Sequence, residues 1–397
     1  MEEVKSYNQI RVLEGFRQVR VTEDDFSSST GYGYNDTGRE KLERLYALIF
    51  GGEKALVRPQ LVSGTHAISC CLFGTLRPGH RVLAVTGPPY DTLQKVIGRP
   101  QDPDGGTLKD FDIDFQTVDV TGPARARDAG GVLKILQPYL EDRQVKLLYL
   151  QRSRGYSLRP ALTMNDLRFL LPLLRRAFPD GILFVDNCYG EFVEEEEPLQ
   201  GGADLMAGSL IKNPGGGLAP SGGYVVGRGD LVEQAAGRLT APGLGSALGP
   251  TLGANRMLIQ GLFLAPHFVG EALKGSIFAA RLFKSLGYET FPKFDDNRGD
   301  IVQAILLGEE GLLKEFCRLI QAYSPVDSHA LPLPGPVPGY QREVIMAAGT
   351  FVQGSSLELS ADAPLGPPYA VYLQGGLSYP HTRAAVSAAA QALTAKK

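Results

Sequence analysis

The sequence predicts an α/β protein with a mostly parallel central sheet, a smaller C-terminal α/β domain and an N-terminal arm. Between about residues 55 and 228, short apolar runs alternate with helical stretches, and each run is continuously apolar rather than alternating. Such strands are buried on both faces, as happens when helices cover both sides of a parallel sheet. After Gly287 a second, shorter series of strands and helices begins, which predicts the smaller domain.

The chain divides into three parts. Its 397 residues are too many for one small core, because a domain usually has about 100–200 residues. We assign an N-terminal arm and helix to residues 1–50, a large domain to 51–265 and a small C-terminal domain to 266–397. The helix is expected over 39–50, where apolar residues recur at helical spacing. The stretch before it is too polar to form a core, so we expect an arm.

The elements of the two domains follow in order along the chain. In the large domain, strands are expected within 55–62, 81–90, 146–151, 182–192, 208–217 and 222–228, and helices from Gly64 and over 167–178. Past about Pro242 the sequence is helical. In the small domain, strands are expected within 288–292, 301–308, 343–351 and 369–377, with helices over 310–323 and at the C-terminus.

Composition excludes several classes of protein. A net charge of −3 argues against a general nucleic-acid binder. No apolar run is long enough to span a membrane, and the polar N-terminus has no signal-peptide core. The four cysteines are scattered and no CxxC occurs, so neither a disulfide framework nor a metal site is expected. We therefore expect a cytoplasmic protein without a metal.

Two features at the start of the large domain are candidates for ligand binding. Gly64 and Thr65 open a helix after a strand, where backbone N–H groups favour a phosphate. The alternative is an ordinary N-cap provided by Ser63. Tyr90 follows the strand that begins at residue 81, at the edge where open α/β sheets bind ligands. The alternative is a surface tyrosine after a turn.

Two charged residues at strand ends complete the pattern. Asp186 follows an apolar run, so its carboxylate needs a cationic partner, although a salt bridge or a cap would also explain it. Lys212 ends another apolar strand beside glycines, where burial lowers the pKa of an amine and makes it nucleophilic. The alternative is a lysine that extends to solvent. Pyridoxal phosphate requires such a lysine, a carboxylate for its ring nitrogen, N–H donors for its phosphate and an aromatic on its ring.

With these residues in place, the chain resembles the pyridoxal-phosphate enzymes of the cystathionine and methionine γ-lyase group. It is most similar to the branch called aluminium resistance proteins or methionine γ-lyase family proteins. The strings that carry the resemblance are GYGYNDTGRE, SGTHAI, VTGPPYDTL, QRSRGYS, DNCYGEF, GSLIKNPGGG and AAGTFVQGSSLELSAD. The resemblance implies the fold type I architecture of pyridoxal-phosphate-dependent transferases, and pyridoxal 5′-phosphate as the cofactor.

Six residues match those that hold the cofactor in the relatives. The resemblance implies that three contact the phosphate, one stacks on the ring, one holds a proton on the ring nitrogen and one forms the Schiff base. In that order they are Gly64, Thr65 and Ser209, then Tyr90, Asp186 and Lys212. The resemblance further implies that Tyr90, Asp186 and Lys212 are catalytic.

Two parts of the site depart from the relatives. In the relatives, a tyrosine and an arginine of the N-terminal segment reach the phosphate of the neighbouring subunit. Tyr32 or Tyr34 would take that part here, but no Tyr-x-Arg occurs. Arg152 and Arg154 stand where the relatives have an asparagine near the phenolic oxygen of the cofactor. A guanidinium there would hold that oxygen or the carboxylate of the substrate.

The resemblance implies a carbon–sulfur lyase that acts on a sulfur-containing amino acid and releases a thiol, a keto acid and ammonia. Lys212 would also serve as the base at the Cα atom of the substrate. The alternatives are an aminotransferase, which needs a second amino acceptor, and a non-catalytic protein on the same scaffold. The family further implies a homo-oligomer, with a dimer as the minimum unit and often a tetramer.

Overall fold

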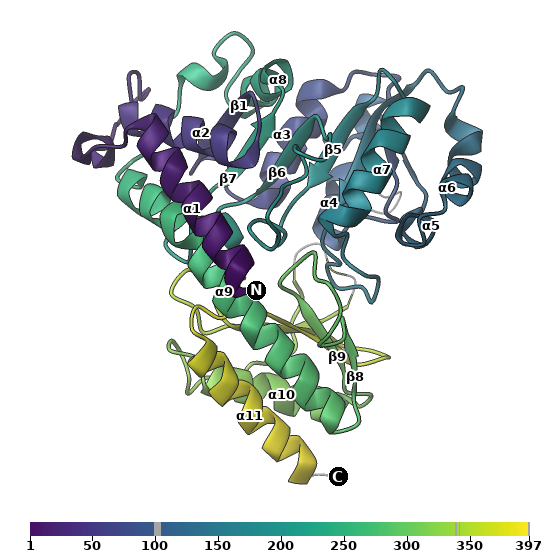
Figure 1. The fold of residues 1–397 in the computed structure, drawn as a ribbon, viewed down its shortest axis with the longest axis vertical. Coiled ribbons are helices and arrows are strands. Elements are labelled where there is room, and N and C mark those ends of the chain that lie inside the picture. Colours follow the sequence, from purple (N-terminus) through teal and green to yellow (C-terminus); the bar gives the residue numbers. More distant parts are fainter. Residues whose placement is uncertain (99–104, 338–339, 341, 396–397) are drawn as a thin grey trace.

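The computed structural model describes residues 1–98, 105–337, 340 and 342–395. Its two sheets are joined by one long helix, α9 (Asn255–Ser285), which runs from the larger sheet to the smaller one (Figure 1). The domain boundary expected at residue 265 lies inside this helix. No helix among the described ranges is both long and apolar enough to cross a membrane.

The larger sheet has seven strands and confirms the predicted mostly parallel α/β fold. Their order across the sheet is β1 (Lys54–Arg58), β7 (Gly223–Gly227), β6 (Leu205–Ser209), β5 (Ile182–Asp186), β4 (Val145–Gln151), β2 (Arg81–Ala84) and β3 (Asp114–Thr117). Strand β7 runs antiparallel to both of its neighbours, and the remaining pairs are parallel. The carboxyl ends of β2, β4, β5 and β6 therefore meet at one edge.

Helices cover both faces of this sheet, which explains the continuously apolar runs. In β4, Leu148 packs into the core beside one set of helices, and Leu147 into the core on the opposite face. One set consists of α2 (Thr37–Phe50), α5 (Thr121–Arg125), α6 (Ala129–Leu136), α7 (Met164–Ala177) and α9. The other set consists of α3 (Gly64–Thr75), α4 (Asp91–Ile97) and α8 (Gly229–Leu239).

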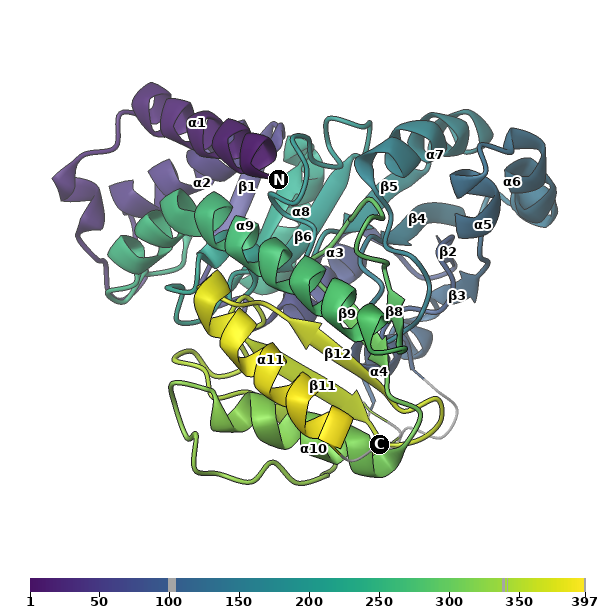
Figure 2. The same ribbon diagram turned by 60° about the horizontal axis from the view of Figure 1, so that its bottom comes forward.

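The smaller sheet is antiparallel and packs against helices on one side. Its order is β10 (Val344–Ala347), β11 (Ser360–Pro364), β12 (Ala370–Gln374), β9 (Gln303–Leu306) and β8 (Glu289–Phe291). Helices α10 (Glu310–Ala322) and α11 (Tyr379–Ala395), together with the end of α9, share its core. Figure 2 shows α9, α10 and α11 beside this sheet.

The N-terminal segment differs from the predicted arm. Residues Glu2–Val19 form helix α1, which lies along α9 of the same chain in both views (Figures 1 and 2). Val12 and Val19 are buried there. The sequence prediction failed because the buried stripe of this helix is narrow and includes Asn8, whose side chain donates to the Phe192 carbonyl at 3.1 Å. The segment after α1 does leave Tyr32 and Tyr34 on the surface.

Candidate active site

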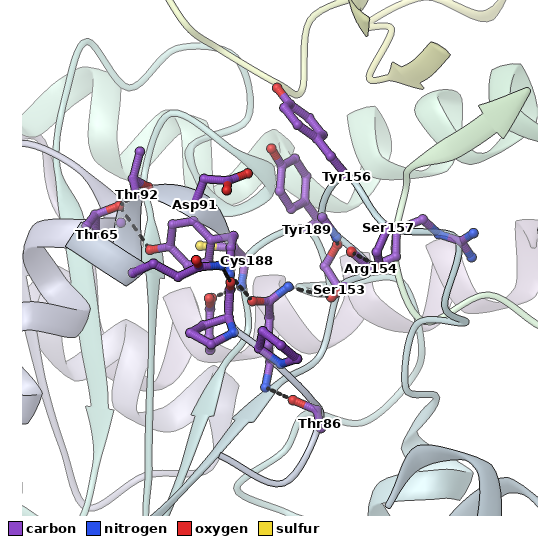
Figure 3. A pocket seen from close by; sticks show the side chains of 18 of the residues that line it. Thr65, Thr86, Asp91, Thr92, Ser153, Arg154, Tyr156, Ser157, Cys188 and Tyr189 are labelled. Atoms are coloured by element: carbon purple, nitrogen blue, oxygen red, sulfur yellow. Dashed lines mark hydrogen bonds between the residues drawn. The ribbon is translucent and has the colours of Figure 1, made fainter. Parts of the chain in front are cut away.

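A cavity of about 510 Å³ opens at the carboxyl ends of β2, β4, β5 and β6 (Figure 3). Ligands bind at this edge in open α/β sheets. The cavity is lined by the start of α3, the loops that follow β2, β4 and β5, the end of β6 and one residue of the small domain, Tyr340. Seven of the predicted site residues line it: Gly64, Thr65, Tyr90, Arg154, Asp186, Ser209 and Lys212.

At one end of the cavity, helix α3 begins close to the end of β6. Ser63 caps this helix by accepting a hydrogen bond from the His66 amide at 3.1 Å. Ser63 is therefore the N-cap that the alternative interpretation expected. Gly64 and Thr65 still line the cavity. A Cβ atom on Gly64 would lie 3.2 Å from the Ser209 Cβ and 3.1 Å from the Cys188 sulfur. Glycine therefore brings the helix N-terminus and the Ser209 hydroxyl into one cradle.

Tyr90 is held at both of its ends. Its backbone N–H donates to the Gln151 side-chain oxygen at 2.9 Å. Its hydroxyl lies 2.9 Å from the Thr65 hydroxyl, and Thr65 lies 3.2 Å from the Thr92 hydroxyl (Figure 3). The phenol ring therefore has a fixed position on the wall of the cavity, and the alternative of a loose surface tyrosine is excluded.

Asp186 is a buried carboxylate whose two oxygens are oriented by neighbours. The Tyr149 hydroxyl donates to one oxygen at 3.0 Å, and the Cys188 amide donates to the other at 3.1 Å. Burial raises the pKa of Asp186, against the effects of Lys212 and these hydrogen bonds. The raised pKa means that the cost of burying the ionised form outweighs the attraction of Lys212 and of these hydrogen bonds. The carboxylate is thus suited to a protonated ring nitrogen in the cavity.

Lys212 is half-buried, and its ammonium nitrogen lies 3.8 Å from the centroid of the Tyr189 ring, at the wall of the cavity. The alternative of a lysine that extends to solvent is therefore wrong. The sequence predicted a lowered pKa for this amine, and in the chain without a bound cofactor that direction is wrong. Burial does lower the pKa, but Cys188, Tyr189 and other acidic groups around the amine raise it by more, and the net pKa is well above the usual value.

Tyr189 is the main site residue that the sequence prediction missed. Its string, DNCYGEF, was recognised, but only Asp186 received a role. The Tyr189 backbone has a φ of 70°, a conformation that bulky residues rarely adopt. This conformation carries the ring over Lys212, and its hydroxyl lies 3.4 Å from the Ser356 hydroxyl of the small domain. An unusual backbone angle leaves no signal in a single sequence.

Two other predicted residues lie outside the cavity. Arg152 does not hold a ligand, because its guanidinium is fully buried among acceptors. It donates to Asn187 at 2.8 Å and to Glu194 at 2.8 Å, so that it braces the loop after β5. Tyr34 does not contact the cavity of its own chain; it lies on the surface with its ring 5.6 Å from that of Tyr32.

The fold and the site define the class of protein. The chain adopts the fold of pyridoxal-phosphate-dependent proteins of fold type I. One solved structure with this fold is the pyridoxal-5′-phosphate-dependent protein YhfS from Escherichia coli, with a TM-score of 0.64, 17% identity, and coverage of 100% of this chain and 97% of that one. At that identity the likeness shows the fold alone.

The chain belongs to the methionine gamma-lyase family, whose model matches residues 1–394. It is 47% identical, over all of its own length and 93% of the other, to an uncharacterized protein of Bacillus subtilis, YnbB. A carbon-sulfur lyase involved in aluminum resistance from Clostridium novyi has a TM-score of 0.91 and 45% identity, covering 98% of this chain and 91% of that one. A protein of Clostridium acetobutylicum, named as a candidate cystathionine beta-lyase involved in aluminum resistance, has a TM-score of 0.93 and 45% identity, covering 99% and 91%.

Proposed function

We propose that this protein is a pyridoxal-phosphate-dependent carbon–sulfur lyase that acts on a sulfur-containing amino acid. The observation that carries the proposal is that the buried Asp186 and the half-buried Lys212 line one cavity together with the cradle at Gly64. A buried charge such as that of Asp186 is costly unless a ligand or a partner pairs with it. The family and the carbon-sulfur lyase from Clostridium novyi support the choice of reaction.

The donor groups fit pyridoxal phosphate. Gly64, Thr65 and Ser209 would hold the phosphate at the N-terminus of α3, and Tyr90 would cover the ring. Asp186 would keep a proton on the ring nitrogen. When bound, the cofactor supplies an aldehyde for Lys212 and a ring that accepts the electrons of the bond broken at the substrate Cα atom.

The side chains of the protein then divide the remaining work. In its neutral form, the amine of Lys212 would take the proton from the substrate Cα atom, because it lines the cavity. The hydroxyl of Tyr90, which Thr65 holds in place, is a second group that could donate or accept a proton. The ring of Tyr189 contacts the ammonium group of Lys212. The expected products are a thiol, a keto acid and ammonia.

We further propose that the protein works as a homo-oligomer with a dimer as its minimum unit, and as a tetramer when dimers pair. Tyr32 and Tyr34 support this proposal, because they are 69% and 61% exposed and lie next to each other on the surface. Paired exposed aromatic residues are typical of contacts between chains. In the oligomer, Tyr34 would reach the cofactor phosphate of the neighbouring subunit.

A screen of single amino acids tests the lyase. The protein is incubated with methionine, cysteine, homocysteine and cystathionine in turn, and thiol and keto acid are measured together. A lyase releases the two in equal amounts without any added keto acid. Keto-acid formation that depends on an added amino acceptor would instead indicate an aminotransferase. A protein that binds the cofactor but converts none of these amino acids would contradict the proposal.

A further inference from the structure

A second, smaller cavity of about 60 Å³ lies between the two domains. The large domain contributes Arg125, Arg154 and the segment around Pro160, and the small domain contributes the segment from Phe291 to Gly299, including Arg298. Arg154 is the one residue that lines both this cavity and the larger one. In Figure 3 it lies on the far side of Tyr189 from Thr65, away from the proposed phosphate end.

The walls of this cavity carry buried N–H groups that no hydrogen bond satisfies. Arg154 is 3% exposed and Arg298 is 8% exposed. The Nε and Nη1 atoms of both arginines have no hydrogen-bond partner among the residues that the structure describes. Unsatisfied buried polar groups are rare and costly, most of all when they are charged. These four atoms therefore point to a missing acceptor.

Asp300, the buried carboxylate beside Arg154, does not supply that acceptor. One oxygen of Asp300 already accepts from the Ser153 hydroxyl at 2.9 Å and from the Arg154 amide at 3.0 Å. The other oxygen accepts from the Val302 amide at 3.2 Å. The Arg154 Nε atom lies 3.8 Å from Asp300, which is too far for a hydrogen bond.

The charges around the cavity are also unbalanced. Burial, together with the smaller effect of the Arg154 charge, lowers the pKa of Arg298 to about 10 in spite of Asp300 and Asp296. Asp296 lies on the exposed part of the loop. Arg125, at the rim, is partly exposed, and its charge is offset by Asp166 at 3.7 Å.

We propose that this interdomain cavity binds a small anion, a carboxylate or an inorganic oxyanion, through the guanidinium groups of Arg154 and Arg298. The oxygens of an anion there would accept hydrogen bonds from the unsatisfied N–H groups, in the fork geometry that arginine provides. It would also link the two domains, because each contributes one arginine. The site is separate from the cradle at Gly64, and the proposal does not depend on the lyase activity.

Calorimetric titration of the purified protein with acetate and with sulfate tests the proposal, with ionic strength held constant by a bulky buffer anion. The wild type should bind one anion per chain in a saturable manner. Arg298→Met should weaken binding by about tenfold or more, because two charge-assisted hydrogen bonds are lost. Arg383→Gln, an exposed arginine on α11, is the matched control and should bind as the wild type does. Absence of saturable binding to the wild type, or equal affinity in Arg298→Met, would overturn the proposal.

Thermal unfolding separates an anion site from a structural arginine. Without added anion, the Tm of Arg298→Met should lie close to that of the wild type, since the variant removes a buried charge but also the 2.6 Å hydrogen bond to Gln303. With saturating acetate, the wild-type Tm should rise by roughly 3 °C and that of the variant should not. A variant that is destabilised by the same amount with and without acetate would show that Arg298 is only a structural partner, and the proposal would fail.

One further titration distinguishes the source of the anion. The acetate titration is repeated with an excess of L-alanine. Displacement of acetate would assign the site to the carboxylate of an amino acid that enters from the larger cavity through Arg154. Unchanged acetate binding would assign it to a free anion. Both outcomes support the anion site.

Discussion

At the scale of single residues, the site depends on a buried carboxylate and a half-buried lysine whose surroundings determine their protonation. Asp186 is oriented by Tyr149 and by the Cys188 amide, and Lys212 is confined by Tyr189. The strand-end positions of Asp186 and Lys212 were predictable, because an apolar run that ends in a charge has few explanations. Their neighbours were not, since Tyr149 is contributed by the adjacent strand and Tyr189 by an unusual backbone conformation.

Asp186→Asn should retain part of the cofactor but lose most of the turnover. The amide cannot hold a proton on the ring nitrogen, and a loss of about 3 kcal/mol corresponds to a rate lower by roughly a hundredfold. Steady-state kinetics, together with the absorbance of the bound cofactor, measure both quantities. Asp180→Asn, at an exposed position, is the control. Near-normal turnover with the cofactor fully bound would count against this role of Asp186.

Glu191 predicts a pH dependence of stability. It is fully buried, its Oε1 atom accepts from the Tyr224 hydroxyl at 2.7 Å, and burial raises its pKa to about 8. Because the folded state binds this proton more tightly than the unfolded state does, its contribution to stability is present at low pH. That contribution is lost as the pH rises from the ordinary value of 4.5 toward about 8.

Glu191→Gln should therefore remove this loss. Within that pH range, the free energy of unfolding of the wild type should fall relative to that of the variant by up to about 1.4 kcal/mol per pH unit. Denaturant unfolding at several pH values measures the difference. The same experiment on Glu195→Gln, at an exposed position, should leave the pH profile unchanged. Parallel profiles for the wild type and Glu191→Gln would refute the assignment.

At the scale of elements, prediction succeeded where burial gives a strong pattern. Strands β4 and β5 are buried on both faces and so appear as unbroken apolar runs. The edge strand β3 (Asp114–Thr117) was missed because its residues are half-buried or exposed and mostly polar. Strand β11 (Ser360–Pro364) was missed because small and polar residues fill a buried strand. Helix α1 was missed because its apolar stripe is narrow.

Helix α1 provides a test of its own packing. Val12→Ala should lower the free energy of unfolding by about 2 kcal/mol, since it removes two buried methyl groups from the contact with the core. Ile10→Ala on the same helix is the matched control, because Ile10 is 58% exposed and should cost little. Equal losses in the two variants, measured by denaturant unfolding, would mean that α1 does not pack as the structure has it.

At the scale of the whole molecule, the larger sheet presents the site at one edge and the smaller domain closes it. Tyr340 lines the cavity from the small domain, and Ser356 contacts Tyr189. The sequence predicted two α/β units and a helical stretch between them, but the boundary expected at residue 265 falls inside the single helix α9, because apolar periodicity does not mark where one domain ends. The interdomain cavity was also beyond prediction, since Arg154 and Arg298 are far apart in the sequence.

Assembly is tested by Tyr34→Ala. The side chain lies on the surface of the single chain, so the variant should fold with unchanged helix content. If Tyr34 reaches the phosphate of a neighbouring subunit, the variant should begin to release its cofactor at a higher protein concentration than the wild type does when both are diluted. Analytical ultracentrifugation and cofactor absorbance follow the two processes. Tyr7→Ala, at an exposed position on α1, serves as the comparison. Identical cofactor retention in Tyr34→Ala and the wild type would remove Tyr34 from the site.

The central claim is that Lys212 holds the cofactor of this protein, and peptide mass mapping after borohydride reduction tests it most directly. The purified protein is reduced and digested, and the peptide that carries the reduced pyridoxyl group is identified. The account predicts that the group lies on Lys212 and that Lys212→Ala abolishes the labelled peptide, whereas Lys109→Ala, at an exposed lysine, does not. A label on another lysine, or wild-type labelling of Lys212→Ala, would contradict it.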